Sequence, residues 1–301
     1  MQLFIHVNLK IIKGKKMFLD HLDIKEYHQL PDINAHFLMT AIKNCKRAQR
    51  EREKPRHPTT RMNWGIYIHT AVETRNMEKN FYLEPYEIDG IVLRSAKTGK
   101  LLKKGEELLE ELKTEVAPKI ILSQKEWDMV EGCMENAWSH PDAKILLHCA
   151  KFEISGFCTL QGIDVKARPD LDCTKEIGAL ADIKTRQGDK ADAESWNRDL
   201  HNTRTYIQAG LQLLVWETLT KTKVKDYYYI LIEVDDPYEV NVTYMDEKLI
   251  EFSKEEAINA IEKWKSWEQN KSVPGYGKPQ AQSLLPWKRR EMVMMEMEEP
   301  W

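Results

Sequence analysis

The succession of strand and helix patterns in the second half of the chain constrains the fold most. Apolar and polar residues alternate after Lys151, and the segments 163–165 and 179–183 continue this alternation, which has the period of a β-strand. A long helical pattern follows over 194–220, and the apolar run 227–234 predicts a buried strand. Successive strands joined through a helix to a further buried strand predict an α/β fold, with a central mixed β-sheet flanked by helices.

The first half of the chain has mainly helical patterns. Apolar residues recur there at helical spacing, and Pro55 and Pro58 end the first such pattern. The segment 81–105 is rich in turn residues and predicts neither a helix nor a strand clearly. The helices predicted in this half are 34–53, 64–77, 124–138 and 141–149. In the second half, 240–244 is the expected hairpin partner of the buried strand, and 254–269 is the expected last helix.

The length and composition of the chain suit a compact protein. Its 301 residues, 42% of them hydrophobic, can bury one large core or two modest ones. We expect a single domain over residues 27–272. A helical N-terminal part belongs to this arrangement, with an extension over 1–26, and a tail rich in Pro and Met follows over 273–301.

Several features that would assign other classes of protein are missing from the sequence. No apolar stretch approaches the roughly 20 residues of a spanning helix, and the N-terminus lacks the parts of a signal peptide, so we expect a cytoplasmic protein without a membrane role. The five cysteines are never spaced as C-x-x-C, which argues against a disulfide framework, a zinc knuckle or an iron–sulfur cluster. There is no G-x-x-x-x-G-K-[ST] motif, so no ATP-driven motor is expected.

A dense run of positive charge lies between residues 43 and 61. The net charge of the chain is -3, but binding of a polyanion depends on where charges lie rather than on their sum. The alternative interpretation is a solvated helix face followed by a loop. The cations proposed here as DNA contacts are Lys43, Lys46, Arg47, Arg50 and Arg61.

The residues with the clearest chemical meaning are Arg168-Pro169-Asp170 and, twelve positions after Asp170, Asp182-Ile183-Lys184. Asp182 and Lys184 are two residues apart and therefore point to the same face of a strand. We expect Asp170 to join them from the neighbouring strand. Two carboxylates with an open coordination shell suit magnesium, and Lys184 would orient or deprotonate an attacking water. The alternative is a strand end with an ordinary salt bridge.

Five motifs in order make residues 27–270 resemble the RecE-type branch of the PD-(D/E)xK nucleases, the phage and prophage exonucleases. Each motif is weak alone, and their order and spacing give the resemblance its weight. The five are Gly65-x-x-x-His69, Glu153, Arg168-Pro169-Asp170, Asp182-Ile183-Lys184 and Tyr206-Ile207-Gln208-Ala209. A further motif near the N-terminus, Tyr27-His28 with Ile33-Asn34, precedes them.

The resemblance implies roles for particular residues. His69, Asp170, Asp182 and the Ile183 carbonyl would hold Mg²⁺, for which Mn²⁺ is expected to substitute. Glu153 would bind a second metal or orient a metal-bound water, with a plain strand carboxylate as the alternative. Gln208 and Tyr206 would position Lys184 and the scissile phosphate, with helix packing as the alternative. The family's further tyrosine, four residues beyond the glutamine, is replaced by Gln212.

The resemblance also implies an activity and partners. It predicts a magnesium-dependent exodeoxyribonuclease that degrades linear double-stranded DNA from its ends, in the 5′-to-3′ direction, in the cytoplasm of a bacterial host. The 3′ single strand would pass to a RecT-type annealing protein in DNA recombination, and a ring-shaped homo-oligomer would enclose the DNA. The alternatives are a structure-specific or endonucleolytic member of the superfamily and a catalytically inactive module that binds DNA or a partner.

Overall fold

A computed structural model describes residues 16–20, 22–54, 59–188 and 190–270. The predicted tail over 273–301 and most of the extension over 1–26 lie outside these residues. Within the described parts of the chain, no helix is both long and apolar enough to cross a membrane.

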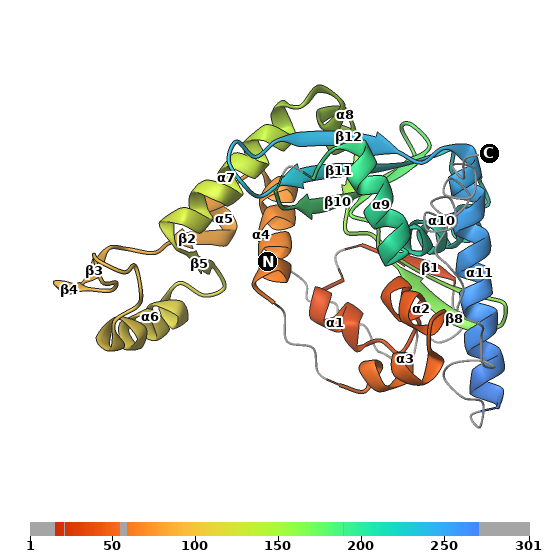
Figure 1. Cartoon of the computed structure of the whole chain (residues 1–301), viewed down its shortest axis with the longest axis horizontal. Coiled ribbons are helices and arrows are strands. Elements are labelled where there is room, and N and C mark those ends of the chain that lie inside the picture. Colours follow the sequence, from red (N-terminus) through yellow and green to blue (C-terminus); the bar gives the residue numbers. More distant parts are fainter. Residues whose placement is uncertain (1–15, 21, 55–58, 189, 271–301) are drawn as a thin grey trace, which may run out of the picture.

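A five-stranded sheet forms the centre of the molecule, with the order β12-β11-β10-β9-β6 (Figure 1). β10 runs parallel to β11, whereas the other neighbouring strands pair antiparallel, so the predicted mixed sheet is confirmed. The parallel pair is joined by helices, as parallel strands require. The bounds are β6 Lys151–Phe152, β9 Leu171–Cys173, β10 Ala179–Arg186, β11 Asp226–Glu233 and β12 Val240–Tyr244.

A second sheet has the order β1-β7-β8. The hairpin of β7 (Ser155–Leu160) and β8 (Ile163–Ala167) accounts for the first predicted strands. β1 (Met17–Leu19) pairs with β7, so the chain enters the fold before the expected domain boundary at residue 27. Short helix α1 (Ile24–Gln29) follows β1.

Helices cover both faces of the central sheet. One core packs α4 (Thr60–Thr74), α7 (Gln124–Ser139) and α8 (Pro141–Cys149) against one face. The other core contains α9 (Ala193–Thr203), α10 (Tyr206–Thr220) and α11 (Glu247–Gln269). At Gly210 a Cβ would lie 2.0 Å from the Ser253 carbonyl oxygen, so only glycine lets α10 and α11 approach this closely.

The structure divides each of two helices predicted from the sequence into two separate helices. The pattern over 34–53 is divided into α2 (Ala35–Ala41) and α3 (Cys45–Arg52), because the Asn44 side chain accepts a hydrogen bond from the Arg47 amide and caps a new helix. The pattern over 194–220 is interrupted at Arg204, which has φ 61° and ends α9 before α10 begins.

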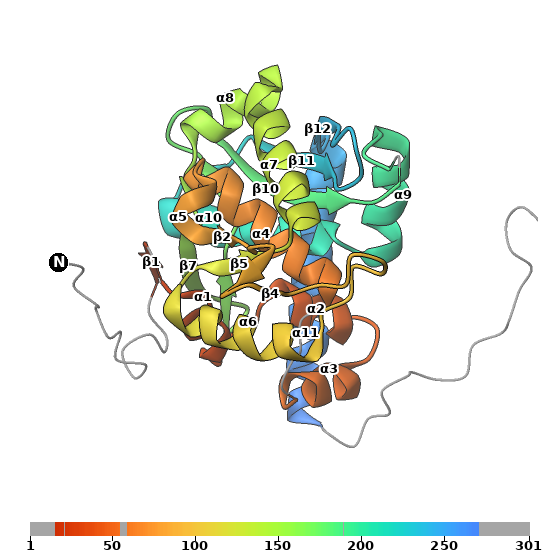
Figure 2. The same cartoon turned by 90° about the vertical axis from the view of Figure 1, so that its left-hand side faces the viewer.

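The segment with no clear pattern forms an arm that projects from the body (Figure 1). It is long and thin in that view, and Figure 2 looks along it onto its helix α6. The sequence pattern did not identify this helix. The elements of the arm and its base are α5 Met77–Asn80, β2 Phe81–Leu83, β3 Glu87–Ile88, β4 Ile91–Val92, α6 Lys103–Glu115 and β5 Ile120–Leu122.

Candidate active site

The candidate site begins where β9 and β10 lie side by side. Leu171 pairs with Ala181, so Asp170 and Asp182 are next to each other on neighbouring strands, as the spacing predicted. The Asp170 amide donates to Asp182 Oδ1 at 3.2 Å, and Asp170 Oδ2 accepts from the Ile183 amide at 2.7 Å. These bonds fix both carboxylates on a rigid sheet.

Three side chains from different elements form an open cluster. The carboxylates of Glu153 and Asp170 and the imidazole of His69 offer ligand atoms that all lie within 4.8 Å of one another. Glu153 follows β6 with φ 55°, an unfavourable backbone for a residue with a side chain, and its amide donates to the Asp170 carbonyl at 3.2 Å. Two oxygen ligands and one nitrogen ligand suit a divalent cation such as Mg²⁺ or Mn²⁺.

His69 is oriented by the strand that carries the aspartate. Its Nε2 lies 3.1 Å from the Ile183 carbonyl oxygen, which can only accept, so Nε2 carries the hydrogen. Nδ1 then faces Asp170 Oδ1 at 3.5 Å. Burial opposes protonation of His69, but Asp170 outweighs it, and the pKa is raised from its ordinary value. Metal-binding histidines commonly donate their second N–H to a backbone carbonyl in this way.

Glu153 is held by a buried arginine. Arg168 Nη1 lies 3.4 Å from Glu153 Oε2, while Arg168 Nε donates to the Ser155 hydroxyl at 2.8 Å. Arg168 also donates to the Leu22 carbonyl and stacks 4.6 Å from the centre of the Tyr27 ring, so α1 is tied to the site. Burial and then Asp170 raise the pKa of Glu153 to about 7.

Asp182 lies in a closed network behind the cluster. Its side chain is fully buried. Besides the Asp170 amide, Oδ1 accepts from Gln212 Nε2 at 3.2 Å. Oδ2 accepts from Lys184 Nζ at 2.8 Å and from Gln208 Nε2 at 2.6 Å. Both oxygens are therefore satisfied by the protein itself, and Asp182 is not one of the three clustered ligands.

Lys184 is held as a cation by Asp182 and Asp170. Its ammonium also approaches Gln208 Oε1 at 3.4 Å. Burial opposes the charge, but Asp182 and Asp170 outweigh this cost, so the pKa of Lys184 is raised from its ordinary value. A lysine in this state offers positive charge and hydrogen-bond donors rather than a base.

Gln212 and Tyr227 belong to the network although the sequence did not assign them a role. Gln212 lies one turn after Gln208 on α10 and donates to the Arg168 carbonyl as well as to Asp182. The Tyr227 hydroxyl, from β11, donates to Gln212 Oε1. A tyrosine hydroxyl thus reaches the site from a strand instead of from the helix. The i,i+4 spacing of Gln208 and Gln212 is the signal that could have identified Gln212.

Tyr206 is not brought to the cluster. It lies two residues from Gln208, which places it on another side of α10. Its ring packs at 5.2 Å from Phe252 of α11 and at 5.6 Å from His201 of α9, measured between ring centroids. The structure therefore favours the packing interpretation for Tyr206 and the positioning interpretation for Gln208.

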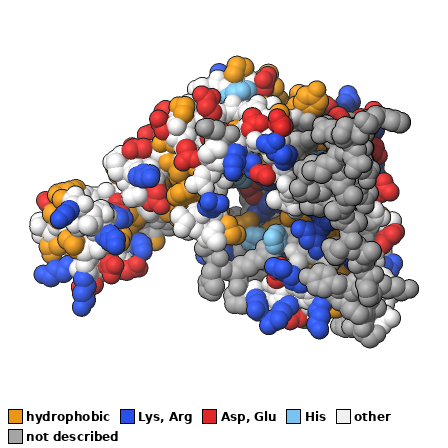
Figure 3. All heavy atoms as spheres, viewed as in Figure 1, with side chains coloured by type: hydrophobic (Ala, Val, Ile, Leu, Met, Phe, Trp, Pro, Cys, Tyr) orange, Lys and Arg blue, Asp and Glu red, His pale blue; other side chains and the backbone are white. Residues whose placement is uncertain are grey.

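The predicted basic run has exposed cations on two elements. Lys43, Lys46, Arg47 and Arg50 are exposed on α3 and just before it, and Arg61 is exposed in the first turn of α4. Arg47 pairs with Glu51 at 2.7 Å. Figure 3 shows Lys and Arg side chains gathered along the edge of the molecule over α3, and a hollow near its centre with acidic side chains inside.

The mixed sheet and the cluster beside Lys184 define a PD-(D/E)xK-type nuclease core. The family model described as "PDDEXK-like domain of unknown function (DUF3799)" matches residues 36–282. Since this match covers most of the chain, the protein belongs to that family. A search of curated proteins found no match.

A solved structure shares this fold. It is the crystal structure of a "Putative exonuclease" from Eubacterium rectale, with a TM-score of 0.58 and 8% sequence identity. The alignment covers 90% of this chain and 98% of the other. At this identity the likeness shows the fold, and together with the family match it supports a nuclease.

Proposed function

We propose that this protein is a magnesium-dependent exodeoxyribonuclease that degrades linear double-stranded DNA. The observation that carries the proposal is the cluster of His69, Glu153 and Asp170 within 4.8 Å, next to a lysine held as a cation. Carboxylate and imidazole ligands beside a fixed positive charge suit metal-dependent phosphodiester hydrolysis. Mg²⁺ is the proposed ion and Mn²⁺ the proposed substitute.

The residues of the site would divide the chemistry between them. A bound divalent ion supplies a Lewis acid and lowers the pKa of coordinated water. Asp170 and Glu153 would hold the ion through oxygen and His69 through Nδ1, with the Ile183 carbonyl fixing the imidazole. Lys184 would offset negative charge that develops on the phosphate, because its raised pKa keeps it protonated.

Asp182 would act through its neighbours. It keeps Lys184 charged and in place, and Gln208 holds both. A direct contact of Asp182 with the ion, as the motif implies, would require Oδ2 or Oδ1 to exchange one of its present hydrogen bonds. We therefore propose His69, Glu153 and Asp170 as the primary ligands.

The DNA path is proposed to cross the central hollow and the exposed cations of α3 (Figure 3). Phosphate contacts by exposed lysine and arginine supply most non-specific affinity for duplex DNA. A local patch is needed because the whole chain carries a net charge of -3.

The finer parts of the proposal come from the resemblance to the RecE-type enzymes. They are digestion in the 5′-to-3′ direction, transfer of the 3′ strand to a RecT-type annealing protein, a ring-shaped homo-oligomer, action without ATP, and location in the bacterial cytoplasm. The family match and the shared fold are compatible with each of them.

One experiment tests the proposal. The protein is incubated with linear duplex DNA that is labelled at one end or the other, and separately with covalently closed circular duplex DNA. Each incubation contains either Mg²⁺ or EDTA. We expect the linear DNA alone to be shortened from its ends, and only with Mg²⁺. Cleavage of closed circles would identify an endonuclease instead. Binding without cleavage in any metal would identify an inactive module.

A further inference from the structure

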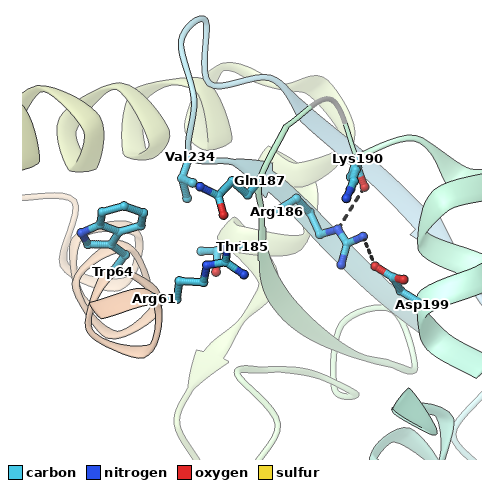
Figure 4. Close-up of a pocket in the computed structure, with 8 residues that line it drawn as sticks. All are labelled: Arg61, Trp64, Thr185, Arg186, Gln187, Lys190, Asp199 and Val234. Atoms are coloured by element: carbon cyan, nitrogen blue, oxygen red, sulfur yellow. Dashed lines mark hydrogen bonds and ion pairs between the residues drawn. The ribbon is translucent and has the colours of Figure 1, made fainter. Parts of the chain in front are cut away.

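A polar cavity lies between the first turns of α4 and the end of β10, near the cluster (Figure 4). Its volume is about 260 Å³. Arg61 and Trp64 line it from α4, and Thr185 and Arg186 line it from β10, with Lys190 and Asp199 on the far side. None of these residues belongs to the cluster or to the network around Asp182.

The cavity and the cluster lie at different positions along the same two elements, α4 and β10. α4 and β10 run next to each other: His69 Nε2 lies 3.1 Å from the Ile183 carbonyl, and a Cβ at Gly65 would lie 3.8 Å from Thr185 Oγ1. Arg61 is one further helical turn along. On β10, two strand residues from Ile183 to Thr185 span roughly 6.6 Å. Along β10 the wall of the cavity therefore begins roughly one nucleotide spacing from Ile183, and along α4 Arg61 lies roughly 12 Å of helix axis from His69.

The charge of the cavity is positive and partly preorganised. Arg186 pairs with Asp199 at 2.5 Å and donates to the Lys190 carbonyl at 2.9 Å, which fixes its guanidinium at the wall. Arg61 and Lys190 are both exposed, and neither side chain forms an ion pair with another residue that the structure describes. Three cations thus face one carboxylate, and that carboxylate is already paired. An anion is the ligand that this arrangement suits.

We propose that this cavity binds a phosphate of the DNA strand that is next to the scissile phosphate. The proposal rests on the proposed function and adds a second fixed point to it. One phosphate at the cluster and its neighbour in the cavity would fix the strand in register and in one direction across the site. Contacts with phosphates position a strand without selecting a sequence, so this subsite would set geometry and not sequence preference.

The test neutralises single phosphates of the DNA and cations of the cavity together. Each duplex of one series carries a single methylphosphonate, which is placed at one position near the mapped cut and moved by one position in the next duplex. A second pair of duplexes ends in a 5′-phosphate or in a 5′-hydroxyl. In the wild type, neutralising the adjacent phosphate should lower kcat/KM by about 10- to 100-fold, the value of a charge-assisted contact. In Arg61→Ala/Lys190→Ala, the same neutralisation should cost little more, because the contact is already lost.

The control is Lys46→Ala/Arg50→Ala, which removes two exposed cations of α3 and should keep the wild-type sensitivity to the methylphosphonate. Equal sensitivity in the cavity variant and the wild type would overturn the proposal. Sensitivity to the 5′-phosphate instead of an internal position would assign the cavity to a terminal phosphate. The same comparison by fluorescence anisotropy in EDTA needs no hydrolysis, so a wild type that cleaves none of these duplexes would reject the proposed function separately.

Discussion

Asp170 and Asp182 are adjacent, yet their surroundings are opposite. Asp170 directs one oxygen into an open cluster with His69 and Glu153, and its side chain keeps an exposed fraction of 17%. Asp182 is completely buried and accepts hydrogen bonds from Lys184, Gln208, Gln212 and the Asp170 amide. The same residue type therefore serves an open half and a closed half of one site.

The difference separates binding from positioning. Lone pairs that the protein leaves unsatisfied are free for a cation, whereas a carboxylate surrounded by donors holds those donors in place. A preorganised network of this kind fixes charged groups before substrate arrives, which lowers the cost of reorganisation during reaction. Substitutions in the open half are therefore expected to weaken metal binding, and substitutions in the closed half are expected to lower the free energy of unfolding.

The largest expected effect comes from the two aspartates themselves. Asp170→Asn should abolish hydrolysis and Mn²⁺ binding with a smaller loss of stability than Asp182→Asn, because Lys184 keeps its direct ion pair with Asp182. Asp182→Asn should also abolish hydrolysis, and it should lower the free energy of unfolding by roughly 3 kcal/mol, because Lys184 loses its buried partner. Activity assays, Mn²⁺ titration by electron paramagnetic resonance and urea unfolding measure these quantities. Equal stability of the two variants would break the comparison.

Lys184→Ala should follow, with a loss of about 10²- to 10⁴-fold in kcat, as is typical for a positioned acid–base or charged group. Mn²⁺ affinity should stay near the wild-type value, because Lys184 does not belong to the cluster. Single-turnover kinetics at saturating metal measure the loss. A decrease in kcat of less than about tenfold would show that Lys184 serves only as the salt-bridge partner of Asp182.

Replacing Lys46, Arg47 and Arg50 together by Ala should weaken DNA binding uniformly across sequences without changing metal binding. Each lost phosphate contact lowers the slope of log affinity against log salt by about 0.9, so three contacts lower it by roughly 2.7. Anisotropy titrations over a salt series measure the slope.

The matched control for this triple variant is Lys103→Ala/Lys104→Ala/Lys113→Ala on α6, which also removes three cations and one short-range ion pair. We expect it to leave the slope unchanged. A loss in the α6 variant and none in the α3 variant would move the DNA path to the arm.

Glu153 should make metal binding depend on pH, because its pKa is about 7 and a metal would bind only the ionised carboxylate. Glu153 should contribute a rise in Mn²⁺ affinity of roughly tenfold per pH unit below this pKa and none above it, and His69, whose pKa is also raised, should add to the rise. Without metal the sign is reversed. The folded chain keeps this proton to higher pH than the unfolded chain, so stability falls as pH rises from 4.5 to about 7.

Titration of Mn²⁺ into the wild type and into Glu153→Gln at several pH values measures this dependence. The variant should bind less tightly and show a weaker pH dependence, because only His69, whose pKa is also raised, then has to lose a proton. Glu194→Gln, an exposed change on α9, is the control and should behave as the wild type. A wild-type affinity that is flat between pH 5 and 8 would remove Glu153 from the ligand set.

The smallest expected effect is that of Tyr206→Phe. The Tyr206 ring packs against Phe252 and His201, so removing its hydroxyl should leave kcat and KM near their wild-type values. Tyr227→Phe is the informative partner, because it removes the hydroxyl that donates to Gln212. A severe loss of activity in Tyr206→Phe alone would restore the role that the sequence motif implied for it.

Local patterns in the sequence determined much of the architecture. Alternation and apolar runs predicted the strands of the central sheet, and the spacing of Asp170, Asp182 and Lys184 predicted their meeting on neighbouring strands. These predictions succeed because side-chain direction along a strand follows a fixed period of two, whatever the rest of the fold does. The breaks at Asn44 and Arg204 were missed, because a helical period continues across a cap.

Tertiary structure alone decided which carboxylates face outward. The left-handed backbone conformation of Glu153 and its ion pair with Arg168 place its carboxylate in the cluster. Tyr227 lies on a strand, fifteen positions after Gln212 in the sequence, and its hydroxyl donates a hydrogen bond to Gln212. No local period encodes these contacts. Whether an aspartate is open to a cation or enclosed by donors depends on what packs over it, and at this site α10 covers Asp182 and leaves Asp170 open.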